Sequence, residues 1–167
     1  MAGGFRGAWT NKTLHVVVAS TGESLALTLP DLAASSPAWS PDGQHIACVA
    51  MSERGDVGGG EPARQALMGR RLWVVSIDGQ PQAERLTDDP AYRDEYPLWS
   101  ANGSHILFAR FNAEGQASLW LIPAAGGEPL QVVKGLTPAP EWFGYYGHID
   151  WDDLFDWWRG PAVQPAA

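Results

Sequence analysis

The chain contains an internal repeat, and no other feature of its sequence limits the possible folds as much. Residues 36–50, SPAWSPDGQHIACVA, align with residues 96–110, YPLWSANGSHILFAR, at an offset of 60. A second segment recurs at an offset of 47, where residues 72–79 match residues 119–126. Repeats of this size are typical of propellers and solenoids, in which each unit completes its core only against its neighbours.

The two offsets differ because one connection is longer in the first copy. The extra residues fall in the Gly-rich stretch 52–70, where the second copy has only the short stretch 112–117. An insertion confined to one connection, with both flanks intact, is typical of a loop between strands. A third copy of the second segment occurs at residues 14–22, and a third Pro-x-Trp occurs at residues 140–142.

Each unit predicts four short antiparallel strands. The first carries Pro-x-Trp-Ser, and an Asp-Gly or Asn-Gly pair, at residues 42–43 and 102–103, then reverses the chain into an apolar second strand. The third strand carries Leu-Trp, and a further turn leads to a fourth strand at residues 83–87 or 130–134. Four strands in about 45 residues match one propeller blade, so we expect an all-β partial propeller.

The most specific motif is Trp-Ser-Pro-Asp-Gly at residues 39–43, and it resembles the WD-like propeller repeat of the TolB family. A weaker copy, Ser-Ala-Asn-Gly, occupies residues 100–103, and the resemblance extends over about residues 14–135. The family implies a protein-binding platform in the cell envelope, hence a periplasmic or extracytoplasmic location, although residues 1–13 lack the apolar core of a signal peptide. Similar repeats occur as the accessory propeller of prolyl oligopeptidase-like enzymes.

The repeat supplies too few blades for a closed propeller, which has 4–8 of them. We predict an irregular N-terminus (residues 1–13), a half blade (14–35) and two complete blades (36–95 and 96–139). An aromatic capping segment (140–160) and a disordered tail (161–167) follow. Three explanations stay open: a C-terminal fragment of a longer propeller, copies that complete the propeller together, or a stable open array. In each case Trp39 and Trp99 are expected to mark the same place in successive sheets, with similar surroundings.

The aromatic capping segment holds four of the nine tryptophans. Residues 150–161 predict a short helix with one apolar face, which we expect to seal the last blade. A sharper alternative is an aromatic platform for a peptide or a sugar ring, and the third is a loosely ordered end. The platform would be lined by Trp142, Tyr145, Tyr146 and Trp157.

The sequence offers little catalytic chemistry. Gly-x-Ser-x-Gly, zinc-ligand spacing and a phosphate-binding loop are absent from it, so no metal or other cofactor is expected. His45 and His105 occupy equivalent repeat positions, which indicates a role in the blade, and a structural role is also expected for His148. Cys48 is expected to be a buried small hydrophobe. The net charge of −8 with scattered cations argues against nucleic acid, and no stretch has the length of a membrane span.

We therefore expect a non-catalytic binding module for a protein partner or for further blades, with self-assembly as a possible way to complete the propeller. Its recognition face is predicted near Trp39, Trp99, Asp94 and Glu95. The acidic residues near the loop between the two blades, at positions 88–89 and 94–95, are compatible with two structures. One is a surface calcium site and the other is a solvated turn with Asx caps and a Glu95 ion pair to Arg93 or Arg85, and we expect the turn. The alternative function is an accessory propeller of a prolyl oligopeptidase-like hydrolase whose catalytic domain lies outside the chain.

Overall fold

The computed structural model describes residues 12–27, 32–52, 65–78, 82–136, 151 and 154–158. These residues contain ten strands in three antiparallel sheets. A two-stranded hairpin comprises β1 (His15–Val17) and β2 (Ser24–Ala26). The first four-stranded sheet comprises β3 (Ala33–Trp39), β4 (His45–Met51), β5 (Arg71–Ser76) and β6 (Gln82–Arg85). The second comprises β7 (Tyr92–Trp99), β8 (His105–Asn112), β9 (Ala117–Pro123) and β10 (Leu130–Leu136).

Both four-stranded sheets are meanders in which each strand pairs with the next one along the chain. The strand order is β3-β4-β5-β6 in one sheet and β7-β8-β9-β10 in the other. Each sheet therefore has the size and connectivity of one propeller blade. The all-β partial propeller expected from the repeat is confirmed.

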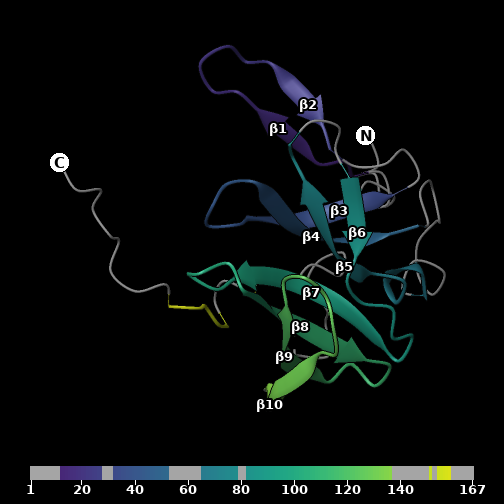
Figure 1. The fold of residues 1–167 in the computed structure, drawn as a ribbon. Helices are drawn as coiled ribbons and strands as arrows, with labels where there is room; N and C mark the ends of the chain where they lie inside the picture. Colours follow the sequence, from purple (N-terminus) through teal and green to yellow (C-terminus); the bar gives the residue numbers. More distant parts are fainter. Residues whose placement is uncertain are drawn as a thin grey trace.

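The sheets lie face to face in chain order, with the β1-β2 hairpin, the first sheet and the second sheet following one another from top to bottom in Figure 1. Three apolar clusters hold this stack together. The first joins the hairpin to the first sheet, through residues such as Leu14, Leu27 and Cys48. The second joins the two sheets, and the third lies on the far face of the second sheet, against Trp151.

The repeat is visible in the backbone as well as in the strand order. The inner strands β3 and β7 each carry a bulge, and Ser36 (φ 53°) and Tyr96 (φ 48°) sit in it with a positive φ, each directly before a proline. Such a φ is uncommon for residues other than glycine. Because the positive φ occurs at two positions related by the repeat, the kink is a regular feature of the inner strand.

Trp39 and Trp99 occupy equivalent places, as predicted. Trp39 pairs with Ile46 and Trp99 with Ile106, each at the end of an inner strand. Their surroundings are not alike, however, since Trp99 is 3% exposed and Trp39 is 46% exposed. Trp99 is covered by the first sheet, whereas the short hairpin on the other side of that sheet does not cover Trp39.

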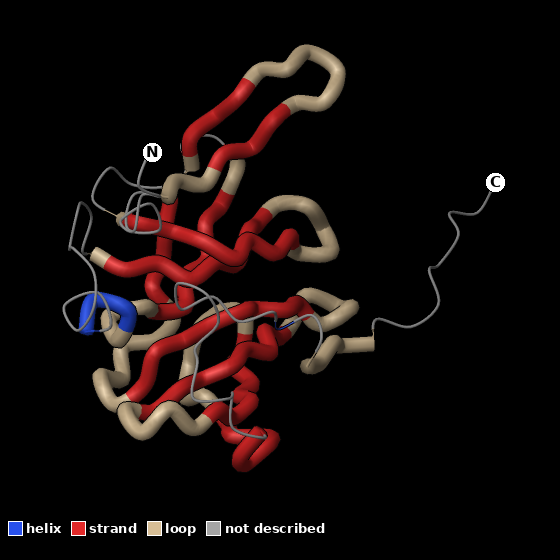
Figure 2. The backbone as a smooth tube through the Cα atoms, turned by 180° about the vertical axis from the view of Figure 1, so that it is seen from behind, coloured by secondary structure: helices blue, strands red, loops and turns tan. Residues whose placement is uncertain are grey.

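Several boundaries differ from the prediction. The inner strands begin at Ala33 and Tyr92, ahead of the Pro-x-Trp motif, because the chain stays extended and paired on both sides of the bulge. Residues 65–67 form one helical turn that the repeat did not predict. Figure 2 shows this turn beside the strands.

The helix expected over residues 150–161 is wrong for residues 155–158, which have no helical structure. Only one turn forms, in which the amides of Leu154 and Phe155 donate to the carbonyl of Trp151. Aromatic residues and Asp are weak helix formers, and a helix this short is marginal without tertiary support. Within the described ranges no helix has the length and apolar character needed to cross a membrane.

Candidate binding surfaces

The first candidate surface is the uncovered part of the first sheet around Trp39. The side chain of Trp39 is 46% exposed at the end of β3. Of the exposed apolar groups of the hairpin, Val17 (59%) and Leu25 (48%) lie on opposite faces, since Leu25 pairs with Val16 and not with Val17. Trp39 is therefore the residue on which this candidate depends.

Trp99 occupies the same repeat position as Trp39, and it is covered by the neighbouring sheet. Its indole Nε1 donates to the carbonyl oxygen of Ala38 at 3.0 Å, across the interface between the two sheets. Its ring packs in the second cluster with Ala47, Val74 and Phe108. Trp99 thus belongs to the core between the two sheets, where it also lines a groove described below.

Asp94 is also buried, at 1% exposure, inside strand β7 and not in a loop. Its carboxylate accepts hydrogen bonds from Arg110 Nε at 2.8 Å, from the Thr87 hydroxyl and from the Leu72 amide at 3.3 Å. Burial raises the pKa of Asp94 above its usual range, and the charge of Arg110 opposes that rise. Because Thr87 and Leu72 lie outside β7, the carboxylate links the second sheet to the first.

Glu95 has a similar structural setting, at 4% exposure. Its Oε1 lies 2.6 Å from Arg70 Nη1 and 3.4 Å from Arg93 Nε. The expected ion pair with Arg93 is confirmed, whereas the expected solvated turn is wrong for Asp94 and Glu95. Both carboxylates serve the interface between the blades, because the inner strand starts earlier than the motif suggested.

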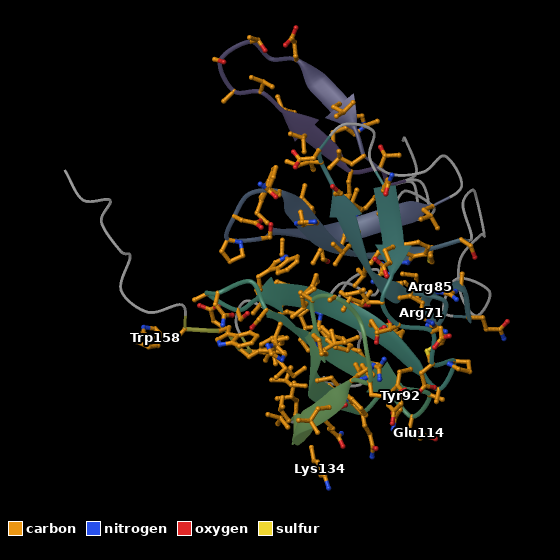
Figure 3. All side chains as sticks on the ribbon, viewed as in Figure 1. Arg71, Arg85, Tyr92, Glu114, Lys134 and Trp158 are labelled. Carbon is orange, nitrogen blue, oxygen red and sulfur yellow. The ribbon has the colours of Figure 1, made fainter. Side chains whose placement is uncertain are left out.

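The basic partner of Asp94 was missed by sequence reasoning. Arg110 is 3% exposed, and its guanidinium carbon lies 4.7 Å from the ring centroid of Trp120 and 5.2 Å from that of Tyr92. Arg71 adds a further link, since its Nη1 donates to the carbonyl of Tyr92 at 2.9 Å. Figure 3 labels the side chains of both residues. Two-residue alternation along β8 could have placed Arg110 on the buried face shared with Phe108.

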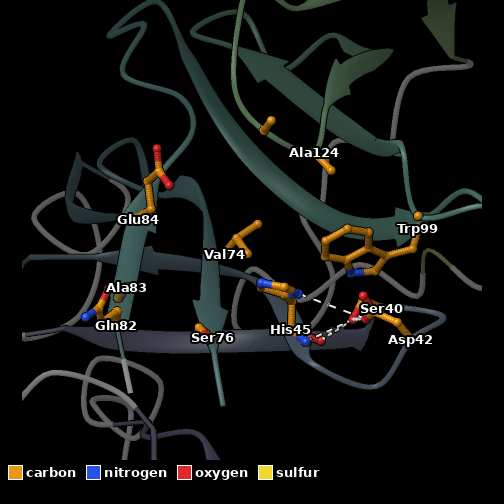
Figure 4. A pocket seen from close by; sticks show the side chains of 12 residues that line it. Ser40, Asp42, His45, Val74, Ser76, Gln82, Ala83, Glu84, Trp99 and Ala124 are labelled. Carbon is orange, nitrogen blue, oxygen red and sulfur yellow. Dashed lines mark hydrogen bonds and ion pairs between the residues drawn. The ribbon is translucent and has the colours of Figure 1, made fainter. Parts of the chain in front are cut away.

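A second candidate is a groove of about 540 Å³ between the two sheets (Figure 4). Ser40, Asp42 and His45 meet there, which invites comparison with a catalytic triad. The geometry is different: Ser40 Oγ donates to Asp42 Oδ1 at 2.5 Å, and His45 contributes its backbone amide to Ser40 Oγ at 2.9 Å. A triad instead needs a serine hydrogen-bonded to the imidazole.

The same hydrogen bonds recur in the second repeat, which explains the cluster. Ser100 Oγ donates to Asn102 Oδ1 at 2.9 Å, and the amide of His105 donates to Ser100 Oγ at 3.0 Å. The backbone amides of His45 and His105 thus make the same hydrogen bond in both blades, and a blade role for their side chains stays a prediction. In the first copy, the bonds from Ser40 and from the Gln44 amide lower the pKa of Asp42.

The aromatic segment contributes two described rings to the third cluster. Trp151 is 3% exposed and lies 5.2 Å from Phe111, while Phe155 lies 5.5 Å from Tyr96. Leu154 and Trp158 of the same segment are 54% and 81% exposed, and residues 155–158 have no helical structure. Trp157 is half-buried. Trp142, Tyr145, Tyr146 and His148 lie outside the described residues, as do most of residues 1–13 and all of residues 161–167.

The loop between the two sheets forms the Asx cap expected for it, where Asp89 Oδ1 accepts the Ala91 amide at 2.9 Å. Asp88 and Asp89 border a smaller cleft of about 370 Å³ that also touches Arg110 and Glu128. Among the residues with described positions, no group of three or more His, Cys, Asp or Glu side chains could hold a metal ion.

Two successive four-stranded meanders with repeated inner-strand bulges define the class: the chain has the fold of TolB-type propeller blades. Among solved structures it is similar to a putative TolB from Agrobacterium tumefaciens, with a TM-score of 0.55, 22% identity and coverage of 74% of this chain and 42% of that one. TolB from Acinetobacter baumannii is similar with a TM-score of 0.51 and 16% identity, over 71% of this chain and 26% of that one.

Among curated proteins, the chain is 33% identical over 97 residues to the "Uncharacterized peptidase YuxL" of Bacillus subtilis (strain 168). The match covers 58% of this chain but only 12% of that protein. No protein-family model matches the sequence. The chain therefore spans a minor part of the length of each of these proteins.

Proposed function

We propose that the chain is a non-catalytic module that binds a protein partner through the uncovered part of its first sheet. The observation that carries this proposal is the contrast between Trp39 and Trp99, which hold the same repeat position at 46% and 3% exposure. Tryptophan is enriched at the centre of protein interfaces, where burying its large ring gives much of the binding energy. A half-exposed tryptophan on a blade face has the properties of such an anchor.

The chemistry of the groove between the sheets supports a binding role more than a catalytic one. Ser40, Asp42 and His45 hold a hairpin turn together, and the second repeat does the same with Asn102 in place of the aspartate. Cys48 is buried, and its thiol has a raised pKa that disfavours the nucleophilic thiolate. Ser40, Asp42, His45 and Cys48 are therefore interpreted as structural residues of the blade.

The test is to replace Trp39 by a photo-crosslinking amino acid, to identify the partner in cells, and to measure its affinity for the purified chain by calorimetry. We expect W39A to weaken that affinity by roughly 10- to 100-fold, as for an interface anchor. The matched control is Leu130→Ala, since Leu130 is 64% exposed on the opposite sheet. Equal affinities of W39A and the parent chain would contradict the proposal.

A second candidate is an accessory propeller of a prolyl oligopeptidase-like hydrolase. The identity of 33% with a protein named as a peptidase favours it, over a region that makes up 12% of that protein. The two candidates differ in what the natural polypeptide contains beyond these residues. A hydrolase domain with a Gly-x-Ser-x-Gly motif in the same open reading frame, with peptide hydrolysis by the full polypeptide, would favour the second.

A further inference from the structure

The smaller cleft, of about 370 Å³, is a second place where the molecule can bind a ligand, and Trp39 does not line it. Its lining comes from the loop that joins the two sheets, at residues 86–89, and from the turn before β10, at residues 127–129. Arg110 and Trp120 of the second sheet complete it. Sites for small molecules usually have volumes from about 300 Å³ upwards, so the cleft has room for a small ligand.

Arg110 brings unused hydrogen-bond donors to this cleft. The side chain is 3% exposed, and its Nε donates to Asp94 Oδ1 at 2.8 Å. Contacts with three rings hold the guanidinium in place, since its carbon lies 4.7 Å from the centroid of Trp120, 5.1 Å from Phe108 and 5.2 Å from Tyr92. Among the described residues, none accepts a hydrogen bond from its Nη1 or Nη2. Because Arg110 lines the cleft, these two groups can donate to a ligand there.

Asp94 fixes the direction of the guanidinium. Its Oδ2 accepts hydrogen bonds from the Thr87 hydroxyl and the Leu72 amide, and its Oδ1 accepts the one from Arg110 Nε. Both oxygens of this carboxylate are therefore occupied by donors of the protein. An arginine that is held in this way presents its remaining N–H groups as a rigid fork, which suits the two oxygens of a ligand carboxylate.

The charges of the cleft limit which carboxylate can bind there. Asp88, Asp89 and Glu128 also line it, and all three residues are exposed. Since the charge of Arg110 is already balanced by Asp94, the lining has an excess of negative charge. A simple anion would be repelled by the three carboxylates, and a simple cation would leave the Nη donors of Arg110 without an acceptor. A ligand that suits both has a carboxylate and an ammonium group in one molecule.

We propose that this cleft binds a free α-amino acid. The carboxylate of the ligand accepts hydrogen bonds from Arg110 Nη1 and Nη2, and its ammonium group lies against the carboxylates of Asp88 and Glu128. The indole of Trp120, whose Nε1 donates to Ser118 Oγ at 2.9 Å, provides an apolar wall for the ligand side chain. This site goes beyond the proposed function, and it does not depend on it.

The experiment titrates the isotope-labelled full chain separately with glycine, L-serine and L-leucine, and nuclear magnetic resonance follows the Nε–H signal of Arg110 and the indole signal of Trp120. We expect saturable shifts of both signals with at least one of the three. The two blocked forms of that amino acid should bind at least about tenfold more weakly, because the N-acetyl form lacks the ammonium group and the amide form lacks the carboxylate. Absence of saturable shifts with all three would overturn the proposal. So would equal binding of the amide form, because the site would then recognise a cation with a carbonyl oxygen, as in a peptide.

Substitutions then test the two ends of the site. Asp88→Asn combined with Glu128→Gln should weaken binding by about three- to tenfold, since both exposed charges are removed. The matched control is Glu114→Gln, at an exposed glutamate of the β8–β9 turn, which should leave the affinity unchanged. Arg110→Lys keeps a charge beside Asp94 but lacks the fork, so we expect a loss of about tenfold or more. If that variant does not fold, the exposed pair still decides, because parental affinity of the double variant would overturn the proposal.

Discussion

At the scale of single residues, the contact between the two blades depends on charges as well as on apolar packing. Asp94 of β7 accepts hydrogen bonds from Thr87 and from the Leu72 amide, and Arg110 of β8 balances its charge. The corresponding positions of the first repeat are Ala34 and Ala50, so the ionic contact belongs to this interface alone within the repeat. Its groups are almost completely desolvated, so the removal of one partner leaves the other buried and uncompensated.

Substitution of either partner should therefore destabilise the protein strongly. We expect Arg110→Ala to lower the free energy of unfolding by about 3–5 kcal/mol, because it leaves the Asp94 carboxylate without its counter-ion. Urea denaturation followed by circular dichroism measures the change. The control is Arg85→Ala, whose side chain is exposed on β6 and should matter by less than about 0.5 kcal/mol. Equal effects of the two substitutions would contradict the buried ion pair.

The thiol of Cys48 provides a second residue-scale prediction. Cys48 is 1% exposed, and burial raises its pKa to about 12. Since the thiolate is the reactive form, a disulfide reagent should modify Cys48 very slowly in the native protein at about pH 8 and rapidly in urea. Absorbance of the released thiol reports the rate. Fast stoichiometric labelling without denaturant would show that the face between hairpin and first sheet is open.

At the scale of elements, the two tight hairpins hold different residues at one equivalent turn position. This residue is an aspartate in the first hairpin and an asparagine in the second. Asp42 Oδ1 accepts hydrogen bonds from Ser40 Oγ and the Gln44 amide, and Asn102 Oδ1 accepts the equivalent bonds in the second repeat. The turn also needs a positive φ at the following glycine, which is 70° for Gly43 and 71° for Gly103. At the acceptor position itself, the two turns differ by the charge of Asp42.

This difference predicts a pH dependence. The pKa of Asp42 is lowered in the folded protein, so its contribution to stability is present above the unfolded-state pKa near 3.8 and is lost as pH falls through the folded-state pKa. We expect Asp42→Asn to unfold at lower urea concentration than the parent chain at about pH 7, and this difference to shrink as the pH falls below the unfolded-state pKa of Asp42 near 3.8. A difference that persists unchanged at low pH would contradict this role for the charge.

The elements that the sequence predicted best are those with a repeated local signal. Asp-Gly and Asn-Gly pairs located both hairpins, and the Leu-Trp segments located β5 and β9. The starts of the inner strands were missed, because the bulge at Ser36 and Tyr96 interrupts the alternation that marks a strand. The aromatic helix was overpredicted, since an apolar face at helical spacing does not compensate for weak helix formers in a short segment.

The candidate site could be predicted in position but not in exposure. Repeat alignment places Trp39 and Trp99 at the same register, and it carries no information on which sheet face has a neighbour. Burial of Asp94 and Glu95 depends on Arg110 and Arg70, which are 16 and 25 residues away from them in sequence. Such contacts follow from the stacking of whole sheets, so a local pattern cannot reveal them.

At the scale of the whole molecule, the described residues cover the two outer faces of the stack unequally. On the far face of the second sheet, Trp151 and Phe155 pack over Phe111 and Tyr96. On the near face of the first sheet, the two short strands of the hairpin leave Trp39 exposed. A propeller blade buries its faces only against neighbours, so the face that exposes Trp39 is where a partner can add buried area.

Unfolding by urea of two variants, Trp99→Ala and Trp39→Ala, is the most direct test of the unequal cover of the two indoles. We expect a loss of about 3–5 kcal/mol for Trp99→Ala, which creates a cavity between the sheets, and of less than about 1 kcal/mol for Trp39→Ala, whose ring is already 46% exposed. Losses of equal size would contradict this expectation, because they would mean that both indoles are covered alike.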